Sequence, residues 1–175
     1  GGAIPVDGAK ALDYYERAAA AGSDSAYVRI GELFRDGSVV PADPRKAFAA
    51  FERAAQLGNA WGKIHLGRAY IGGLGVQADV ERGLSLIREA DIAAGWVMIG
   101  DYRSQGIVVE ADRDAALEAY QNAADKGDVY ALVRLAEAYR DGGLTDRDPE
   151  RSIGLFQRAI DAGDVSARRI LGESH

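Results

Sequence analysis

Histidines and acidic side chains are the residues with which this chain could do chemistry. Its 175 residues include two histidines, His65 and His175, and no cysteine. A zinc site would have to combine one histidine with carboxylates, whereas structural zinc sites are built from cysteine and histidine. A Ser–His–Asp triad is equally hard to assemble from so few histidines, because the imidazole must stand between nucleophile and acid. We therefore expect no catalytic residue, no bound metal and no cofactor.

His65 lies within a helical pattern, and the chain itself shows how freely its position varies. The equivalent positions of other segments carry Arg29, Met98, Arg134 and Ile170. Such variation favours a packed histidine over a ligand. We interpret acidic pairs such as Glu32 with Asp36 in the same way, as components of solvated helix faces.

The glycine-rich segment 72–76 superficially resembles a phosphate-binding loop. In such loops a strand precedes the glycines, and the N-terminus of a helix receives the phosphate. No strand pattern precedes this segment, and Asp79 stands at the start of the next helix, where its carboxylate would repel a phosphate. We interpret the segment as a loop between two helices.

Five aspartates divide the chain at intervals of about 36, 36, 33 and 36 residues, a spacing typical of helical repeat arrays. They are Asp7, Asp43, Asp79, Asp112 and Asp148. The spacing predicts one repeat domain over residues 1–175, with units of about 7–42, 43–78, 79–111, 112–147 and 148–175, the last one truncated. Stacked units of this kind present an extended surface rather than a catalytic cleft.

Each unit begins with the signals of a helix start. In the second unit Asp43 can accept hydrogen bonds from the first turn, and Pro44 gives up an N–H that has no partner there. Apolar residues follow at helical spacing: Ala47, Phe48, Phe51, Ala54 and Ala55. With the closing glycines, the pattern predicts helices near residues 8–21, 25–36, 44–57, 60–72, 80–91, 93–105, 113–126, 129–141, 149–162 and 165–173.

Small residues recur on the second helix of every unit. In the second unit Gly62 is followed by Leu66 and then by another small residue, Gly67. A glycine inside a helix costs roughly 1 kcal/mol relative to alanine, so close packing must offset that cost. We expect this column of small residues to be the contact line between the two helices of each hairpin.

The third unit departs from the pattern in the turn between its helices. The stretch 89–95 is three residues shorter than its counterparts and lacks the closing glycine, so Gly95 falls on the second helix. Two interpretations stay open. One is drift in a loop, and the other is a local change in superhelix curvature that shapes a binding surface.

The pattern as a whole covers nearly the entire chain and is clearest in the second unit. The residues that carry it are Ala47, Phe51, Ala54, Ala55, Gly58, Gly62, Leu66, Gly67, Tyr70, Gly73, Gly75, Val76 and Asp79. In this order they resemble the Sel-one-like repeat, a branch of the tetratricopeptide superfamily. One departure is Arg103, which stands where other units have Tyr70 and Tyr139. The resemblance implies an all-α, right-handed α-solenoid of antiparallel helix pairs.

The resemblance also implies a function. It points to a non-catalytic scaffold or adaptor that binds other proteins or peptides, in an exported bacterial assembly such as alginate-like exopolysaccharide synthesis or secretion. A regulatory module that restrains a sensor or signalling protein is the alternative, and a hydrolase or small-ligand binder is the third. The hydrolase-like branch carries a disulfide in each repeat, and the absence of cysteine here disfavours it. A periplasmic or outer-membrane-associated location is favoured.

Charge and hydropathy limit the partners. A net charge of −6 argues against nucleic acid, which requires a basic surface. No apolar run is long enough to predict a membrane span. The first residues match a loop between units and the last unit is incomplete, so we expect the chain to be a piece of a longer protein, and we favour a monomer.

Two sets of variable positions are candidates for partner binding. Aromatic or basic residues flank the first small residue of the second helix in some units: Tyr27, Trp61, Lys63, Trp96 and Tyr130. On the first helix, Glu16, Glu52 and Arg88 occupy a column that varies in charge. If that helix lines the concave side, as the resemblance to the wider superfamily implies, this column sets the polarity of the groove. Aromatic residues concentrate in interface hot spots. The alternative for the aromatic set is packing between repeats.

Overall fold

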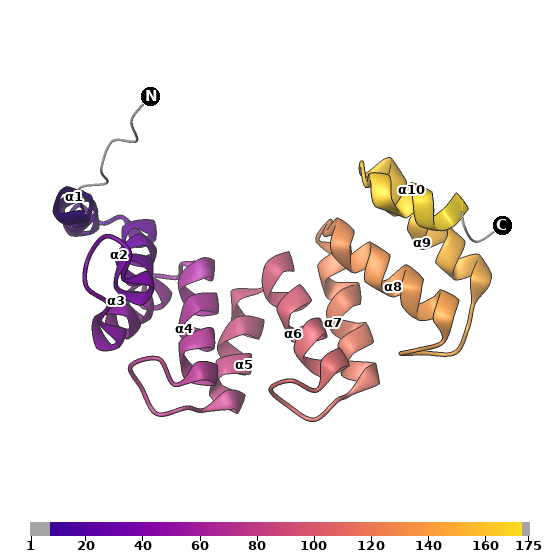
Figure 1. Cartoon of the computed structure of the whole chain (residues 1–175), viewed down its shortest axis with the longest axis horizontal. Helices are drawn as coiled ribbons and strands as arrows, with labels where there is room; N and C mark the ends of the chain where they lie inside the picture. Colours follow the sequence, from indigo (N-terminus) through magenta and orange to yellow (C-terminus); the bar gives the residue numbers. More distant parts are fainter. Residues whose placement is uncertain (1–7, 173–175) are drawn as a thin grey trace. The chain divides into compact units, whose positions relative to one another are not determined.

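The computed structural model describes residues 8–172 and shows that this stretch is all-helical, without strands. The predicted unit start at Asp7 and the terminal His175 lie outside the described residues. The helices are α1 (Gly8–Ala20), α2 (Asp24–Asp36), α3 (Pro44–Gln56), α4 (Ala60–Gly72), α5 (Val80–Ala90), α6 (Ala93–Gln105), α7 (Arg113–Asp125), α8 (Val129–Asp141), α9 (Pro149–Asp161) and α10 (Val165–Gly172) (Figure 1). Every predicted helix is present.

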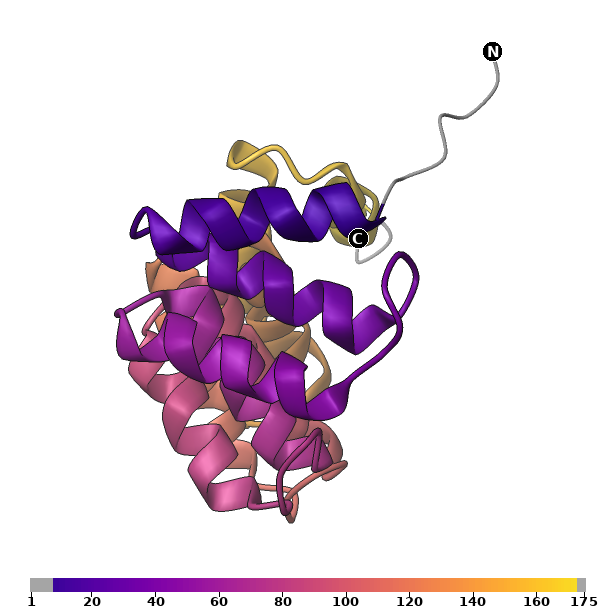
Figure 2. The same cartoon turned by 90° about the vertical axis from the view of Figure 1, so that its left-hand side faces the viewer.

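The chain divides into two compact halves, and the boundary in the sequence falls between Ala90 and Asp91. The N-terminal half carries α1 to α5, and the C-terminal half carries α6 to α10. Within the N-terminal half α1 packs against α2 and α2 against α3, as the indigo helices in Figure 2 show. The division falls in the short turn of the third unit, between α5 and α6.

The predicted aspartate caps are confirmed wherever the structure describes them. The Asp43 carboxylate accepts hydrogen bonds from the backbone N–H groups of Arg45 and Lys46, each at 3.1 Å. Asp112 and Asp148 cap α7 and α9 in the same way. Each cap satisfies donors that a helix start leaves without an intrahelical partner, so a single residue type fixes where these helices begin.

The capping aspartates also tie each repeat to the one before. The backbone N–H of Asp43 donates to the carbonyl of Phe34 near the end of the preceding helix, at 2.9 Å. The same bond recurs from Asp79 to Tyr70, from Asp112 to Arg103 and from Asp148 to Tyr139. Because the acceptor is a backbone carbonyl, the bond does not require the aromatic side chain that Arg103 replaces.

The replacement at Arg103 is matched by a second change in the same repeat. Elsewhere a cation stands over the aromatic ring, with Arg82 at 4.3 Å from the Tyr70 centroid and Arg151 at 4.4 Å from that of Tyr139. The position equivalent to Arg82 and Arg151 is Ala115 in the repeat that follows Arg103. Ring and cation are thus lost together, which avoids placing two cations in contact.

Small residues meet two different neighbours, which corrects one element of the sequence prediction. A Cβ on Gly62 would lie 2.6 Å from that of Ala54, so this position faces the partner helix of its own hairpin, as expected. A Cβ on Gly67 would instead lie 2.6 Å from the carbonyl oxygen of Gly83 on α5, in the next unit. The second small residue therefore serves the packing between repeats. The seams α2–α3, α4–α5, α6–α7 and α8–α9 are closer than the hairpins.

The shortened turn of the third unit is closed by an aspartate in place of glycine. Asp91 has a φ of 48°, in the left-handed region where the other units place Gly22, Gly58, Gly127 and Gly163. Asparagine and aspartate tolerate this region better than other side chains. The Asp91 carboxylate accepts a hydrogen bond from Nε1 of Trp96 at 2.9 Å and pairs with Nζ of Lys126 at 3.0 Å. Gly95 lies within α6, as predicted.

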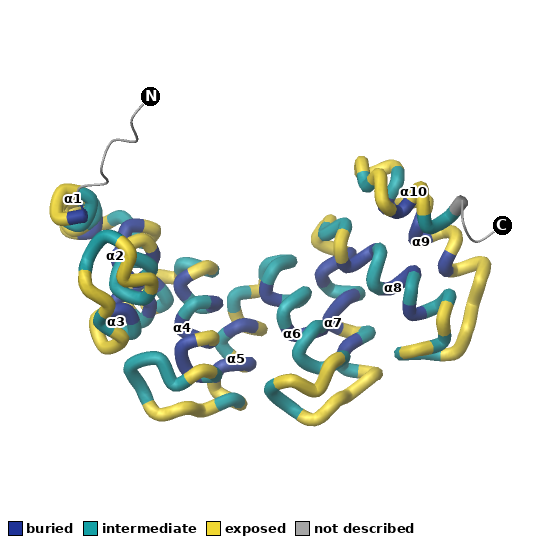
Figure 3. Tube along the Cα trace, viewed as in Figure 1, coloured by how far each residue is buried: buried dark blue, intermediate teal, exposed yellow. Residues whose placement is uncertain are grey.

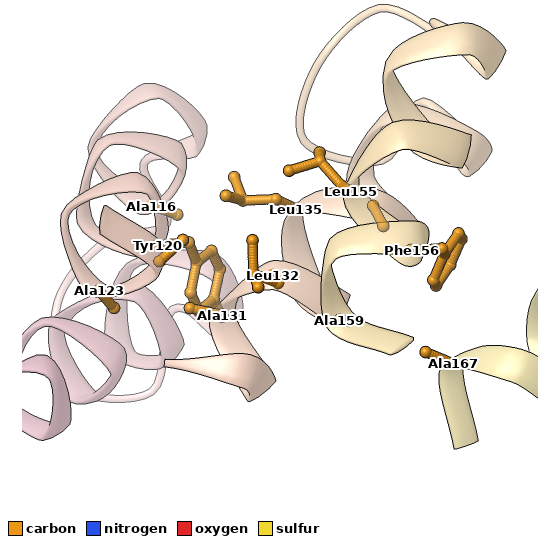
Figure 4. Packing of buried hydrophobic residues seen from close by; sticks show 12 residues of the cluster. Ala116, Tyr120, Ala123, Ala131, Leu132, Leu135, Leu155, Phe156, Ala159 and Ala167 are labelled. Carbon is orange, nitrogen blue, oxygen red and sulfur yellow. The ribbon is translucent and has the colours of Figure 1, made fainter. Parts of the chain in front are cut away.

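Each compact half has its own core of buried side chains. In the C-terminal half Tyr120, Leu135 and Phe156 anchor a cluster that runs from α7 to α10, with alanines between the large groups (Figure 4). In the N-terminal half one cluster forms around Ile30 and another around Phe51. Burial follows the inner faces of the helices, while most of the connecting turns are exposed or half-buried (Figure 3).

Candidate partner-binding groove

A groove of about 380 Å³ opens in the N-terminal half, between α2 and α4. Its walls are formed by Ser25, Val28, Arg29 and Glu32 from α2, and by Asn59, Trp61 and His65 from the start and middle of α4. Both are second helices of their hairpins. The groove therefore lies where two consecutive repeats present equivalent helices side by side.

Trp61 stands at the rim of the groove because of the way α4 begins. Asn59 caps the helix by accepting a hydrogen bond from the N–H of Gly62 at 2.8 Å. Gly62 presses against α3, which fixes the face that α4 turns inward. Trp61, one position earlier, is left 51% exposed. An indole half in solvent and half against the protein is available for contact with another molecule.

His65 forms the floor of the groove, and both of its ring nitrogens face charged side chains. The ring stacks on Phe51 with centroids 4.8 Å apart and planes inclined by 16°. A guanidinium can only donate, so the 3.3 Å contact from Arg35 Nη1 makes Nδ1 the acceptor and leaves the proton on Nε2. Nε2 faces Oε1 of Glu32 at 3.5 Å.

Burial lowers the pKa of His65 below its ordinary value of 6.5, and the nearby guanidiniums of Arg35 and Arg68 lower it further. The Glu32 carboxylate acts in the opposite direction, but its effect is smaller than that of burial. The imidazole is therefore neutral at pH 7. It presents the groove with a ring face and one N–H rather than with a positive charge.

Glu32 provides the acidic group of the groove. Its Oε2 accepts a hydrogen bond from Nη1 of Arg29 at 2.8 Å, one turn earlier on α2. This bond is the main cause that raises the pKa of Arg29. The side chain of Glu32 is 24% exposed. One oxygen is thus engaged within α2, while Oε1 points across the groove toward α4.

The C-terminal half has side chains at the repeat positions that are equivalent to those of the groove. There Asp101 on α6 corresponds to Glu32, Tyr130 on α8 to Trp61, and Arg134 to His65. Asp101 accepts hydrogen bonds from the hydroxyl of Tyr120 at 2.7 Å and from that of Tyr130 at 3.3 Å. Side chains of the chain itself thus converge on this carboxylate.

Two of the predicted anchors are taken up by contacts within the chain. Tyr27 is half-buried against the cluster that contains Ile30. Trp96 is half-buried against the core of the C-terminal half, and its N–H is bound to Asp91. Both residues therefore have packing contacts within the chain, and a role for them in partner binding stays a prediction.

Lys63 and the predicted residues of the first helices lie away from the groove. Nζ of Lys63 donates to the backbone carbonyl of Glu89 at the end of α5, at 3.2 Å. Glu16 and Arg88 are exposed and Glu52 is half-buried, and none of the three lines the groove. The structure places Trp61 at the groove. A role in partner binding stays a prediction for Trp61 as it does for Lys63, Glu16, Glu52 and Arg88.

Sequence reasoning missed Glu32, Arg29 and Asn59 as groove residues. The sequence pattern places Glu32 on a solvated face with Asp36, and Asp36 indeed pairs with Arg35 at 2.7 Å. A usable signal is nevertheless present in the sequence. The same Arg-x-x-Glu spacing recurs from Arg134 to Glu137, where the structure has an equivalent 3.0 Å ion pair.

Within residues 8–172 no three histidine or acidic side chains are arranged to hold a metal ion. None of the described helices is long and apolar enough to cross a membrane.

The family follows from the match to the Sel1 repeat model. Five consecutive copies match residues 1–23, 24–59, 63–90, 97–128 and 129–164. The chain is a Sel1 repeat protein. Such proteins generally mediate protein–protein interactions. Four of the five matches pair the second helix of one unit with the first helix of the next, so they follow the close seams α2–α3, α4–α5, α6–α7 and α8–α9.

Solved structures of similar proteins share the fold. A Sel1 repeat protein from Oxalobacter formigenes is 26% identical with a TM-score of 0.76, over 93% of this chain and 68% of its own. A protective antigen of uropathogenic Escherichia coli with an SLR fold is 23% identical with a TM-score of 0.76, over 93% of this chain and 35% of its own. The cysteine-rich protein B of Helicobacter pylori is 21% identical with a TM-score of 0.56, over 77% of this chain and 99% of its own.

These likenesses place this Sel1 protein among all-α solenoids. The chain spans about 68% and 35% of the lengths of the first two relatives. No curated protein matches its sequence.

Proposed function

We propose that this Sel1 protein is a non-catalytic adaptor that binds a segment of a partner protein in the groove between α2 and α4. One observation carries the proposal: Trp61 is 51% exposed at the rim of a groove of about 380 Å³. The equivalent positions of other repeats hold Ser25, Ala94 and Ser166, so the stack does not require an aromatic residue there. Aromatic residues at a preformed depression are the usual anchors of protein interfaces.

The walls of the groove favour binding because their side chains are already ordered. The His65 ring is fixed by Phe51 and Arg35, and Glu32 is fixed by Arg29. A partner that binds such a surface has little side-chain entropy to remove on the receptor side. The groove therefore supports recognition rather than reaction, since it contains an ion pair and a neutral histidine but no activated nucleophile.

The narrower proposal concerns the setting in which the adaptor works. The family resemblance supports an exported bacterial assembly, such as exopolysaccharide synthesis or secretion. In the alternative, the same groove holds and restrains a sensor or signalling protein. The identity of the captured partner separates the two, because one predicts a secretion or polymerisation component and the other a sensor or enzyme.

The test is capture of partners by the full chain and by two single variants. Trp61→Ala removes the rim indole, and we expect partner enrichment to fall at least tenfold, as for an interface hot spot of about 1.4 kcal/mol or more. Tyr14→Ala is the matched control, because Tyr14 is 67% exposed on α1 and does not line the groove. Circular dichroism confirms that both variants stay helical. Equal capture by all three proteins would refute the groove as the binding site.

A further inference from the structure

The two equivalent places in the chain differ in what surrounds the carboxylate. In the C-terminal half Asp101 receives the hydroxyls of Tyr120 and Tyr130, at 2.7 and 3.3 Å. In the N-terminal half the corresponding residues are Phe51 and Trp61, which have no hydroxyl. Two tyrosine hydroxyls thus donate to the carboxylate in the C-terminal half, whereas the equivalent side chains in the N-terminal half have no hydroxyl to donate to Glu32.

A cation near an aromatic ring also belongs to the place in the C-terminal half. The guanidinium of Arg134 on α8 stands 5.7 Å from the centroid of Tyr120 on α7. In the N-terminal half the equivalent residue is His65, whose imidazole is neutral because burial lowers its pKa. The N-terminal groove has a cation at other repeat positions, since Arg29 is bound to Oε2 of Glu32 at 2.8 Å and Arg35 contacts Nδ1 of His65 at 3.3 Å.

Glu32 retains an acceptor that faces the groove. Its Oε2 is bound to Arg29, but Oε1 has only the long 3.5 Å approach of His65 Nε2. The exposed face of Trp61 lines the same groove. An acceptor carboxylate beside an indole is a suitable environment for an ammonium or guanidinium group, because both attract positive charge. The net charge of −6 favours the approach of a basic partner as well.

We infer that the groove between α2 and α4 accepts a lysine or arginine side chain of the partner, which donates to Oε1 of Glu32 and lies against the indole of Trp61. This inference rests on the proposed function and specifies its partner as a basic segment. The incoming cation supplies to Oε1 of Glu32 the donors that Tyr120 and Tyr130 supply to Asp101, while Arg29 keeps its bond to Oε2.

The test uses the indole N–H signals of the full chain in two-dimensional ¹H–¹⁵N NMR. The chain has two tryptophans, Trp61 and Trp96, and Trp61→Phe assigns the first. The probes are N-acetyl-arginine amide, N-acetyl-lysine amide and N-acetyl-glutamate amide. We expect both basic probes to shift the Trp61 signal with saturation in the millimolar range, roughly as a single ion-aromatic contact allows. Trp96 serves as an internal reference, because its N–H is bound to Asp91.

Two matched carboxylate variants distinguish binding in the groove from non-specific attraction of a basic probe to a negatively charged protein. Glu32→Gln should weaken the binding of the two basic probes at least fivefold. Glu137→Gln should leave them unchanged, because Glu137 makes the same kind of ion pair with Arg134 but does not line this groove. Equal shifts with N-acetyl-glutamate amide, no shift of Trp61 with either basic probe, or equal effects of the two variants would each overturn the inference.

The outcome can be told apart from failure of the proposed function. If partner capture depends on Trp61 while the basic probes show no preference, the groove binds a partner of another chemistry and this inference falls alone. If capture is independent of Trp61, the proposed function falls, and with it the inference about its partner.

Discussion

Phe51 shows how one ring serves both the framework and the groove. A Cβ on Gly31 would collide with its edge, so the ring fills the seam between α2 and α3. Its face carries His65 at 4.8 Å, which forms the floor of the groove. Any change in the packing of the seam would therefore shift the histidine as well, and the two cannot be altered independently.

Substitution by alanine should have opposite effects on stability at two glycines, Gly67 and Gly154. A Cβ on Gly67 would meet the backbone oxygen of Gly83 at 2.6 Å, whereas nothing lies within 4 Å of one on Gly154 in α9. We expect Gly67→Ala to lower the free energy of unfolding by about 1–3 kcal/mol through overpacking. Gly154→Ala should raise it by up to about 1 kcal/mol through helix propensity. Urea denaturation measures both, and equal effects would contradict the assigned seam.

His65 should make stability depend on pH in a defined window. Its folded pKa is lowered, first by burial, so the unfolded chain binds the proton more tightly. The free energy of unfolding should therefore be fully retained above the unfolded pKa of about 6.5 and fall as the pH drops toward the lowered folded pKa, by about 1.4 kcal/mol for each unit of lowering.

Urea titrations at several pH values between about 7.5 and 5, compared with His65→Gln, isolate this contribution of His65. Carboxyls whose pKa is lowered below the ordinary 3.8, such as Asp91, affect the free energy of unfolding only at more acidic pH, outside this range. If the free energy of unfolding of His65→Gln fell with pH as steeply as that of the native chain, the assignment to His65 would be wrong.

At the scale of the helix, capping is the feature that the sequence predicts best. Asp112 accepts from the N–H of Ala115 at 3.0 Å and starts α7, as predicted. Asp112→Ala should lower the free energy of unfolding by about 0.5–2 kcal/mol. Glu118→Ala, at an exposed position of the same helix, should change it by less than about 0.5 kcal/mol. Thermal melts of the two variants provide the comparison, and similar melting temperatures would argue against the cap.

The elements are predictable because their signals are local. Proline after aspartate, glycine in the left-handed region and apolar spacing each act within one or two turns, so the ten helices between residues 8 and 172 follow from the sequence. The groove is not predictable in this way, because Glu32 on α2 meets Trp61 and His65 on α4 only after the repeats stack. The different roles of Gly62 and Gly67 escape sequence reasoning for the same reason, since both look alike along a single helix.

At the scale of the whole chain, each compact half has a core that is complete in itself. The twelve buried residues of the cluster in the C-terminal half span α7 to α10 (Figure 4). Half-buried residues that include Trp96 from α6 pack against them. We therefore expect a fragment of residues 91–175 to fold alone, with a cooperative thermal transition, because repeat arrays are stabilised by contacts between neighbours. Circular dichroism and the dispersion of its amide NMR signals test this. A fragment with the spectrum of an unfolded chain would contradict it.

The second small residue of the repeat has an evolutionary consequence. Gly31 accommodates Phe51 in the seam α2–α3, and Gly100 accommodates Tyr120 in the seam α6–α7. Each of these joints between repeats therefore pairs a glycine on one helix with a bulky ring on the other. A duplicated segment one repeat long carries one of each and can be inserted between existing copies without new compensating changes. Arrays of this kind can lengthen or shorten by recombination, while the exposed Trp61 can vary without changing the side chains of the joints.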